Sequence, residues 1–391
     1  MPALPDFTEL DQLTQSEGVA SALDRLAASF REQGNFPGVF EARLMKTRIA
    51  LGLPAMHQGP LDIPSDDVRK RYEAAQVEAA RETGQLYLES GNLYRAWPYF
   101  RALNEPAPIR EALEKGSPGE DEIDGWVEIA FHERVHPRRG FELILEHYGT
   151  CRAITNFPHY PVEEGKRESA RLLVDHLSQE LAANLKRAVE SVEKKTPESD
   201  SIGDLIAGRD WLFEGAAYYI DTSHVSSIVQ MAPEWDDEPT LRKVIELTEY
   251  GRRLGEMYQF KTDPPFDDLY LDTGVYLRAV LGENVDQAVA HFRAKVSSEP
   301  DPFGNIPAQV LVNLLLRVGR PAEAAAIACE LLTDSDPQYL TCPSPMELCI
   351  QAGDADRLQS LARAKDDLLA YAAAKHLAAR EIPQPSSGAS S

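Results

Sequence analysis

Histidines are the residues of this chain whose distribution most suggests chemistry. The chain has nine histidines, and six of them fall between residues 120 and 260: His132, His136, His147, His159, His176 and His224. Imidazole is a common metal ligand and a general acid or base near neutral pH. A plain helical scaffold requires neither property, so a catalytic or metal-binding centre is expected first in this region.

Two of these histidines belong to a metal-binding letter pattern. Residues 132–136 read HERVH, which matches HExxH, and on a helix this spacing places both imidazoles on one face to bind zinc, with the glutamate as general base. Pro137 follows directly and disfavours helical backbone at His136. The alternative interpretation is a helix C-terminus, where a protonated histidine is stabilised by the helix dipole. His132 and His136 are therefore candidate metal ligands.

A second pattern pairs carboxylates with imidazoles. Glu133 and His136 stand three residues apart, and so do Asp221 and His224. Such pairs, with two further glutamates from facing helices, form di-metal sites in four-helix carboxylate proteins. Aspartate in one pair and Pro137 after the other depart from that arrangement.

Further histidines in the same region could complete a single-metal site. His147 and Cys151 stand four residues apart, which on one helix lets both bind the same ion. His176 supplies another imidazole, and the ion would be divalent zinc, iron or manganese. The alternative is that these side chains belong to an ordinary helical core.

Glu214 is the strongest single candidate for acid–base catalysis. The surrounding residues Leu212, Phe213 and Ala216 are apolar, so we expect the carboxylate to be buried among them. Tyr218 and Asp221 follow at plus four and plus seven, on the same face of an expected helix. The alternative role for Glu214 is an ion pair with an arginine of a neighbouring helix.

Arg138 and Arg139 stand before Gly140 and an expected helix that begins near Phe141. Two guanidinium groups beside a helix N-terminus suit a carboxylate or phosphate ligand. Surface arginines that balance an acidic protein are the alternative. The chain contains no Walker-type loop, GxGxxG motif, nucleophile elbow or kinase motif set, so nucleotide chemistry of the familiar kinds is disfavoured.

The elements that would position these residues are helices. The clearest pattern covers residues 86–106 and carries these motif residues: Gly91, Tyr94, Ala96, Phe100, Ala102 and Pro106. This segment resembles a tetratricopeptide repeat, in which a glycine ends the first helix, an aromatic and a small residue open the second, and proline follows the unit. The resemblance implies antiparallel helix pairs that stack into an α-α superhelix or solenoid.

Similar units recur along the chain. Turn glycines stand at Gly282, Gly319 and Gly353, which are 37 and 34 residues apart, close to the period of about 34 residues of that family. A weaker copy surrounds Gly34. The sequence therefore predicts an all-α, tetratricopeptide-like protein with repeats at both ends of the chain.

Residues 116–262 do not follow the period, although they still read as helical. A long helix is expected from Val162 to Lys195, and Ile202 to Ile220 is apolar nearly all round and is expected to form a central buried helix. The predicted division is residues 1–115 as N-terminal repeats, 116–262 as a histidine-rich middle unit, 263–380 as C-terminal repeats, and 381–391 as a disordered tail.

Composition limits the partners. The chain has 40 basic and 63 acidic residues, a formal net charge of −23 that repels phosphate backbones, so nucleic acid is not an expected partner. No stretch approaches the roughly 20 apolar residues of a membrane span, and the N-terminus lacks the basic and apolar parts of a secretory signal. None of the four cysteines forms a CxxC pair, so reduced thiols and a cytoplasmic location are expected.

These patterns predict an intracellular helical-repeat scaffold that binds a peptide or protein segment on a concave surface. Tyr87, Tyr94 and Trp97 are the expected aromatic anchors, and the acidic charge favours a basic or neutral ligand. The alternative is a metal-dependent hydrolase or lyase whose site lies in the middle unit. Convergence of three or more of the candidate ligands would favour the enzyme, and their dispersal would favour the scaffold.

Overall fold

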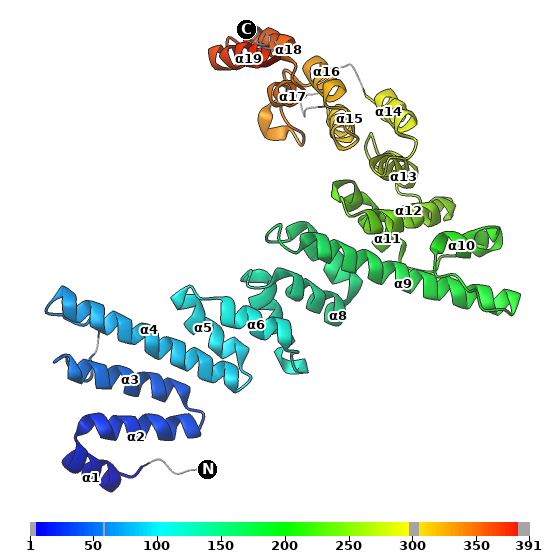
Figure 1. Ribbon diagram of the computed structural model, residues 1–391. Helices are drawn as coiled ribbons and strands as arrows, with labels where there is room; N and C mark the ends of the chain where they lie inside the picture. The colour runs from blue at the N-terminus through cyan, green and yellow to red at the C-terminus, as the bar shows by residue number, and fades with distance from the viewer. Residues whose placement is uncertain (1–4, 58, 297–304, 382–391) are drawn as a thin grey trace, which may run out of the picture. The chain divides into compact units, whose positions relative to one another are not determined.

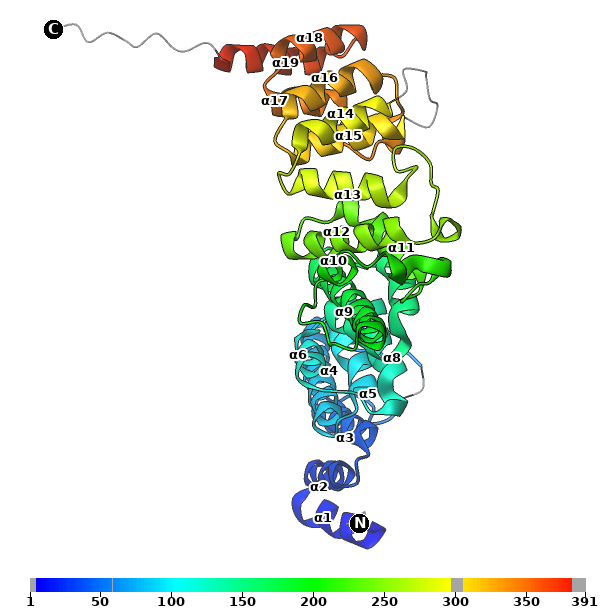
Figure 2. The same cartoon turned by 90° about the vertical axis from the view of Figure 1, so that its right-hand side faces the viewer.

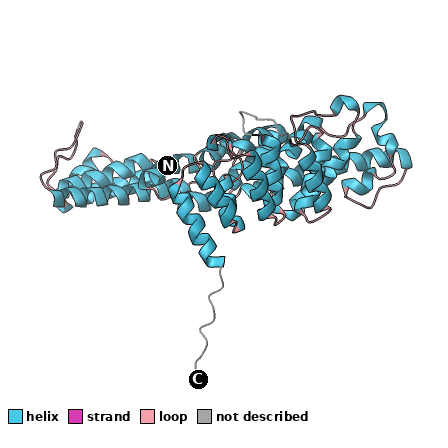
Figure 3. Cartoon of the chain, turned by 90° about the horizontal axis from the view of Figure 1, so that it is seen from above, coloured by secondary structure: helices cyan, strands magenta, loops and turns pink. Residues whose placement is uncertain are grey.

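The computed structural model describes residues 5–57, 59–296 and 305–381, and these residues are all-α (Figures 1 and 3). They form no strand, and a single isolated β-bridge joins Lys261 and Asp268. Most helix–helix contacts join helices that follow one another in the sequence, which defines a helical array. The all-α prediction is confirmed. The predicted disordered tail, from residue 382 onward, lies outside the described residues.

The chain divides into two compact units, residues 1–169 (unit 1) and residues 170–391 (unit 2). The division falls inside the long helix α9, Lys166–Glu193. The bounds of this helix agree closely with those of the helix expected from Val162 to Lys195. It does not coincide with the predicted boundaries after residues 115 and 262. The histidine-rich region is shared between the units, and the predicted three-part division remains a prediction.

Unit 1 consists of helical hairpins followed by shorter turns. Its helices and its 3-10 and π turns (η) before α9 are α1 Phe7–Glu17, α2 Val19–Glu32, α3 Phe36–Ala50, α4 Asp66–Glu89, α5 Leu93–Leu103, α6 Ala107–Lys115, η1 Glu120–Glu122, α7 Ile123–Val127, η2 Glu128–His132, α8 Pro137–Asn156 and η3 Phe157–His159.

Unit 2 continues after α9, and its later helices follow one another in layers (Figure 2). Its elements are α10 Ile202–Ile206, η4 Asp210–Ala216, α11 Thr222–Met231, η5 Ala232–Glu234, α12 Glu238–Arg253, η6 Glu256–Tyr258, α13 Leu269–Val280, α14 Val285–Ala294, α15 Ile306–Arg317, α16 Pro321–Leu331, η7 Pro337–Tyr339, α17 Pro345–Ala352, α18 Ala355–Ala364 and α19 Leu368–Glu381.

The same turn closes five hairpins of the array. The glycines Gly34, Gly91, Gly282, Gly319 and Gly353 all have φ between 71° and 84°. In each turn the N–H of the residue after the glycine donates to a carbonyl five residues earlier, as Asn92 does to Tyr87 at 2.8 Å. This is the Schellman closure of a helix, and only glycine adopts this backbone conformation without steric cost. The turn positions predicted from the sequence are therefore correct.

Aromatic rings fill the space between the hairpins of unit 1. The ring of Tyr87 on α4 meets Phe36 edge-on at 4.9 Å between centroids and lies 5.9 Å from Tyr99. Tyr87 is only 6% exposed. It belongs to the core, and its expected position as a surface anchor is wrong because the helix face that carries it packs against α3 and α5.

The central buried helix expected over residues 202–220 does not form. Helix α10 ends at Ile206, Gly208 adopts a positive φ of 68°, and the 3-10 turn η4 breaks at Gly215, whose φ is 65°. The apolar composition of the segment had indicated one continuously buried helix, but its two glycines allow the chain to turn. The segment is therefore a series of short turns.

One ionic cluster between α13 and α14 is centred on a fully buried carboxylate. The side chain of Asp272 is 0% exposed and accepts hydrogen bonds from the Asp268 N–H at 2.9 Å and the Lys295 ammonium at 2.7 Å, and lies 2.6 Å from the His291 imidazole. A buried carboxylate is tolerated when several donors satisfy it. This cluster therefore joins the two helices of that hairpin.

None of the described helices is both long enough and apolar enough to cross a membrane.

Candidate functional site

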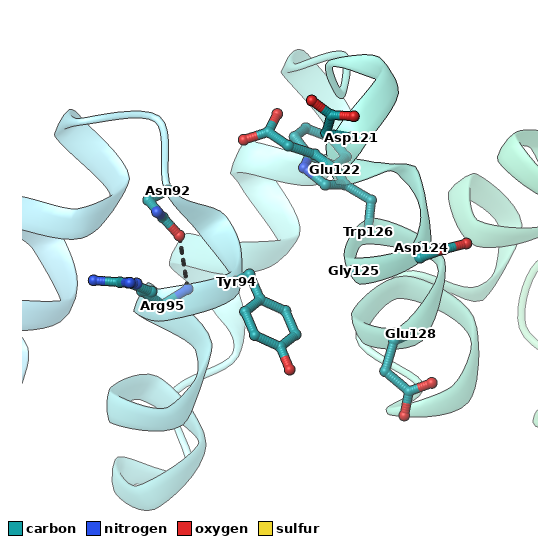
Figure 4. A pocket seen from close by; sticks show the side chains of 9 residues that line it. All are labelled: Asn92, Tyr94, Arg95, Asp121, Glu122, Asp124, Gly125, Trp126 and Glu128. Atoms are coloured by element: carbon teal, nitrogen blue, oxygen red, sulfur yellow. Dashed lines mark hydrogen bonds between the residues drawn. The ribbon is translucent and has the colours of Figure 1, made fainter.

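A cavity of about 560 Å³ lies in unit 1 between the start of α5 and the acidic segment η1–α7–η2 (Figure 4). Its lining consists of Asn92, Tyr94, Arg95, Asp121, Glu122, Asp124, Gly125, Trp126 and Glu128. We call it the acidic pocket. Four carboxylates and one guanidinium line it, together with two aromatic rings.

The hairpin turn at Gly91 fixes where α5 begins. The side chain of Asn92 caps the helix by accepting a hydrogen bond from the Arg95 N–H at 3.0 Å. This cap places Tyr94 in the first turn of α5, with its ring projecting toward α7 (Figure 4). The ring is 64% exposed, which is unusual for a large aromatic side chain and leaves one face available to a ligand.

Gly125 makes the close approach of the Tyr94 ring possible. A Cβ atom at position 125 would lie 3.1 Å from Cδ2 of Tyr94, which is tighter than most real Cβ contacts. Trp126 also lines the pocket and is 7% exposed. The pocket thus has one buried and one exposed aromatic ring.

The carboxylates of the acidic pocket divide into two groups. Glu122 accepts a hydrogen bond from the Gly119 N–H at 3.0 Å, and Asp124 accepts one from the Tyr148 hydroxyl, a bond that raises the pKa of Tyr148. Asp121 and Glu128 are exposed and have no hydrogen bond or ion pair with any described side chain. These two carboxylates are therefore free to bind a cation.

The expected aromatic anchors have different surroundings. Tyr94 lines the acidic pocket, whereas Tyr87 is buried in the core. Trp97 is partly buried, and its Nε1 has no hydrogen-bond partner among the described residues. Of the three, only Tyr94 has the exposure that a ligand-stacking ring needs.

Arg138 and Arg139 lie at the start of α8, as expected, but carboxylates already surround them. Arg138 contacts Glu114 at 3.2 Å and Glu142 at 3.8 Å, and Arg139 bonds Glu142 at 2.8 Å. The nearby His136 also bonds Glu114, whose pKa this contact lowers. Both guanidinium groups have carboxylate partners, although the buried Nε of Arg139 has no hydrogen-bond partner among the described residues. An anion would therefore compete with Glu114 and Glu142 for these arginines.

The HExxH pattern does not lie on one helix. His132 ends the π turn η2, Arg134 has a positive φ of 63°, and His136 is the N-cap of α8. Glu133 is paired with Arg101 at 2.6 Å. The expected helical face is therefore broken between the two imidazoles, as the proline after His136 indicated.

The second chelating pair is separated by a kink. Gly149 inside α8 has φ 80° and ψ 177°, so His147 and Cys151 do not follow each other on a regular helical turn. Both side chains are exposed, and so is His176 on α9. Their expected arrangement on one continuous helix is wrong because the glycine interrupts it.

The three residues expected to form an acid–base site, Glu214, Tyr218 and Asp221, do not share a helical face. Glu214 is exposed rather than buried and has extended backbone with ψ 144°, so it does not share a helical face with Tyr218 and Asp221. Tyr218 is 54% exposed and packs against Tyr258. Asp221 is the N-cap of α11, and the Ser223 hydroxyl lowers its pKa.

His224 lies close to Asp221, with 4.0 Å between its Nε2 and Oδ2 of Asp221. Across residues 5–57, 59–296 and 305–381, no three His, Cys, Asp or Glu side chains are grouped so that they could hold a metal ion. The convergence that the enzyme hypothesis requires is not observed among these residues.

The carboxylates of the acidic pocket were not singled out from the sequence. Their signal in the sequence is the acidic run Gly119-Glu120-Asp121-Glu122-Ile123-Asp124, and such a run is equally typical of a solvated helix face. Its approach to Tyr94 depends on how η1 and α7 fold back along α5, and spacing along the chain does not reveal this.

Comparison of the chain with protein-family models, with curated proteins and with solved structures gives no match.

Proposed function

We propose that unit 1 binds a basic segment of a protein partner in the acidic pocket. The observation that carries the proposal is the exposed Tyr94 ring beside four carboxylates in a cavity of about 560 Å³. Ligand pockets in proteins typically measure about 300–1,000 Å³, so this cavity has room for one or two long side chains. The protein would act by recognition and not by turnover.

The chemistry of the pocket suits lysine or arginine. A cation placed over the face of a tyrosine ring gains about 0.5–1 kcal/mol at an exposed site. Asp121 and Glu128 then have a charged partner, which they lack among the described side chains. Each exposed ion pair adds about 0.2–1 kcal/mol. These contributions are modest, so the proposed binding is of moderate affinity and sensitive to salt.

The wider architecture also supports recognition. We propose that the hairpins form a tetratricopeptide-like solenoid, because the same glycine turn closes five of them. Arrays of this kind present extended surfaces to peptides. A partner that pairs with Tyr94 could continue along the neighbouring hairpin, and a cytoplasmic protein is the partner we propose.

The test is a peptide titration of the full chain by fluorescence anisotropy. The probe is a labelled nonapeptide of alternating lysine, arginine and glycine, compared with an acidic peptide of the same length. In about 0.15 M salt, where exposed charges more than about 8 Å apart are screened, we expect binding of the basic peptide only.

The variant Asp121→Asn/Glu128→Gln removes the two unpaired carboxylates. At about 0.2–1 kcal/mol each, its Kd should rise by about 2- to 30-fold, and Tyr94→Ala should raise the Kd by about 2- to 5-fold. The matched control is Glu32→Gln/Glu73→Gln, which removes the same charge from exposed carboxylates outside the pocket.

Equal losses in the pocket variant and the control would show that the basic peptide responds only to net charge, and the proposal would fail. A pocket-dependent response to free arginine or spermidine, without a response to the peptide, would identify a small cation as the ligand and would also overturn the proposal of a protein segment.

A further inference from the structure

Two cysteine thiols of unit 2 are in contact. Cys329 on α16 and Cys349 on α17 are both reduced, and their Sγ atoms are 3.5 Å apart. They are separated by 20 residues in the chain, and the contact joins the second helix of one hairpin to the first helix of the next. Cys349 is 0% exposed, whereas Cys329 is partly exposed.

The other two cysteines differ from this pair. Cys151 lies on α8 of unit 1 and is exposed. Cys342 lies in the segment before α17, is 8% exposed, and burial raises its pKa to about 11. All four cysteines belong to the described residues, and no hydrogen bond links Cys342 or Cys151 to another thiol there.

The contact makes the two thiols unequal. The hydrogen bond between the two sulfurs lowers the pKa of Cys329 and outweighs burial, which raises it. The positive charge of Arg357 also lowers this pKa, whereas Asp354 raises it. The same bond and burial raise the pKa of Cys349. The more accessible sulfur is thus the more easily ionised one, which is the property of an attacking thiol.

We propose that Cys329 and Cys349 form an oxidative modification site at which hydrogen peroxide produces a disulfide between α16 and α17. In the first step the Cys329 thiolate attacks one peroxide oxygen, the O–O bond breaks, and the hydroxide released takes up the thiol proton as water. In the second step the Cys349 sulfur attacks the Cys329 sulfenic sulfur, the S–O bond breaks, and the second water leaves. Two thiols and one peroxide thus give one disulfide and two waters.

The movement required is small. A disulfide bond is about 2.05 Å long, so the sulfur atoms must approach by about 1.5 Å from their present contact. Rotation of the partly exposed Cys329 side chain provides the readiest movement. The product would tie one hairpin of unit 2 to the next, and reduction would release it.

The experiment exposes the full-length protein to hydrogen peroxide, alkylates the remaining thiols, and maps the peptides by mass spectrometry without reduction. The Cys151→Ser background prevents cross-links between chains. We expect two thiols to be lost, a cross-link between the peptides of Cys329 and Cys349, and a mass decrease of about 2 Da that dithiothreitol reverses.

Two variants separate the roles of the sulfurs. In Cys349→Ala, Cys329 should stop at the sulfenic acid, which dimedone traps, and no cross-link should form. In Cys329→Ser, the buried Cys349 should stay reduced, so the proposal can still be tested if the first variant does not fold. The control Cys342→Ala should keep the cross-link.

Peroxide should first be used at a dose that oxidises Cys151 in the wild-type chain. The proposal would be overturned if both Cys329 and Cys349 could still be alkylated after that treatment. A cross-link that includes Cys342 in place of either residue would do the same.

Discussion

Gly251→Ala should destabilise unit 2, although alanine is the better helix former. Gly251 lies in the last turn of α12, and a Cβ atom there would approach the ring carbons of Tyr270 closer than 3.0 Å. Tyr270 is 0% exposed, and so is its neighbour Tyr250. The ring has no solvent-filled space into which it can move.

The magnitude follows from two opposing terms. Replacing glycine by alanine inside a helix gains about 0.8–1 kcal/mol. Forcing an extra carbon into a closely packed core costs typically about 1–3 kcal/mol and occasionally more. Because the overlap is severe and involves ring atoms of a fully buried side chain, we take the upper end of that cost, which leaves a net loss of about 2 kcal/mol. For a unit of this size that corresponds to about 4–8 °C in Tm.

Gly125→Ala is the matched control. Its Cβ would also face an aromatic ring, at 3.1 Å from Tyr94, but that ring is 64% exposed and can rotate into solvent. The gain in helix propensity and the cost of the contact should nearly cancel, so the stability should change by less than about 0.5 kcal/mol. The displaced ring should instead weaken binding in the acidic pocket.

The assay is thermal and urea unfolding followed by circular dichroism, with hydrogen exchange of the α12 and α13 peptides as the local measurement. We expect faster exchange in α12 and α13 for Gly251→Ala and unchanged exchange there for Gly125→Ala. A Gly251→Ala protein as stable as the wild type would refute the reasoning, because it would mean that the core around Tyr270 accepts another carbon atom.

Three further predictions concern charges and ionisable groups in unit 2. Asp272→Ala removes the buried carboxylate that His291 and Lys295 contact. Both partners are partly exposed and Lys295 keeps Asp267, so the variant should lose about 1.5–3 kcal/mol in urea unfolding; a loss below 1 kcal/mol, roughly an exposed pair's contribution, would contradict the structural role of this cluster. Burial raises the pKa of Tyr250 to about 12 from 10.0, so its contribution to stability is complete below pH 10.0 and is lost between 10.0 and about 12; stability curves of wild type and Tyr250→Phe that run parallel at alkaline pH would disprove this. The Lys295 ammonium lowers the pKa of Asp267 below 3.8, so this stabilisation is present above pH 3.8 and is lost as the pH falls through the lower folded pKa; Asp267→Asn should flatten the acid limb of the stability curve, and an unchanged limb would exclude a contribution from this pair.

The parts of the fold that were predictable from the sequence are those that local geometry decides. A glycine at Gly91 or Gly319 ends a helix because its own backbone adopts a positive φ, whatever lies beyond the turn. The same reasoning, applied in full, would have corrected one error. Gly208 and Gly215 interrupt the apolar segment over residues 202–220, and apolar content alone does not outweigh two residues that permit turns.

The candidate site was predictable only where it coincides with the repeat pattern. Tyr94, a motif residue of the clearest repeat unit, was among the expected aromatic anchors. Tyr87 has the same residue type seven positions earlier and was assigned the same role, yet it is 6% exposed where Tyr94 is 64% exposed. The difference lies in the neighbours that each helix face meets, which one sequence does not disclose.

The position of the acidic pocket has a structural reason. The long hairpins of unit 1 stop after α5, and the segment that follows α6 folds into η1, the five-residue helix α7 and the π turn η2. A long helix packed along α5 would cover an aromatic ring, as α3 and α5 cover Tyr87. The short turns instead leave the Tyr94 ring exposed and bring their carboxylates to its side. Where the regular packing of the array ends, residues of the repeat become available for binding, so a ligand site is best sought at such interruptions and not within the regular hairpins.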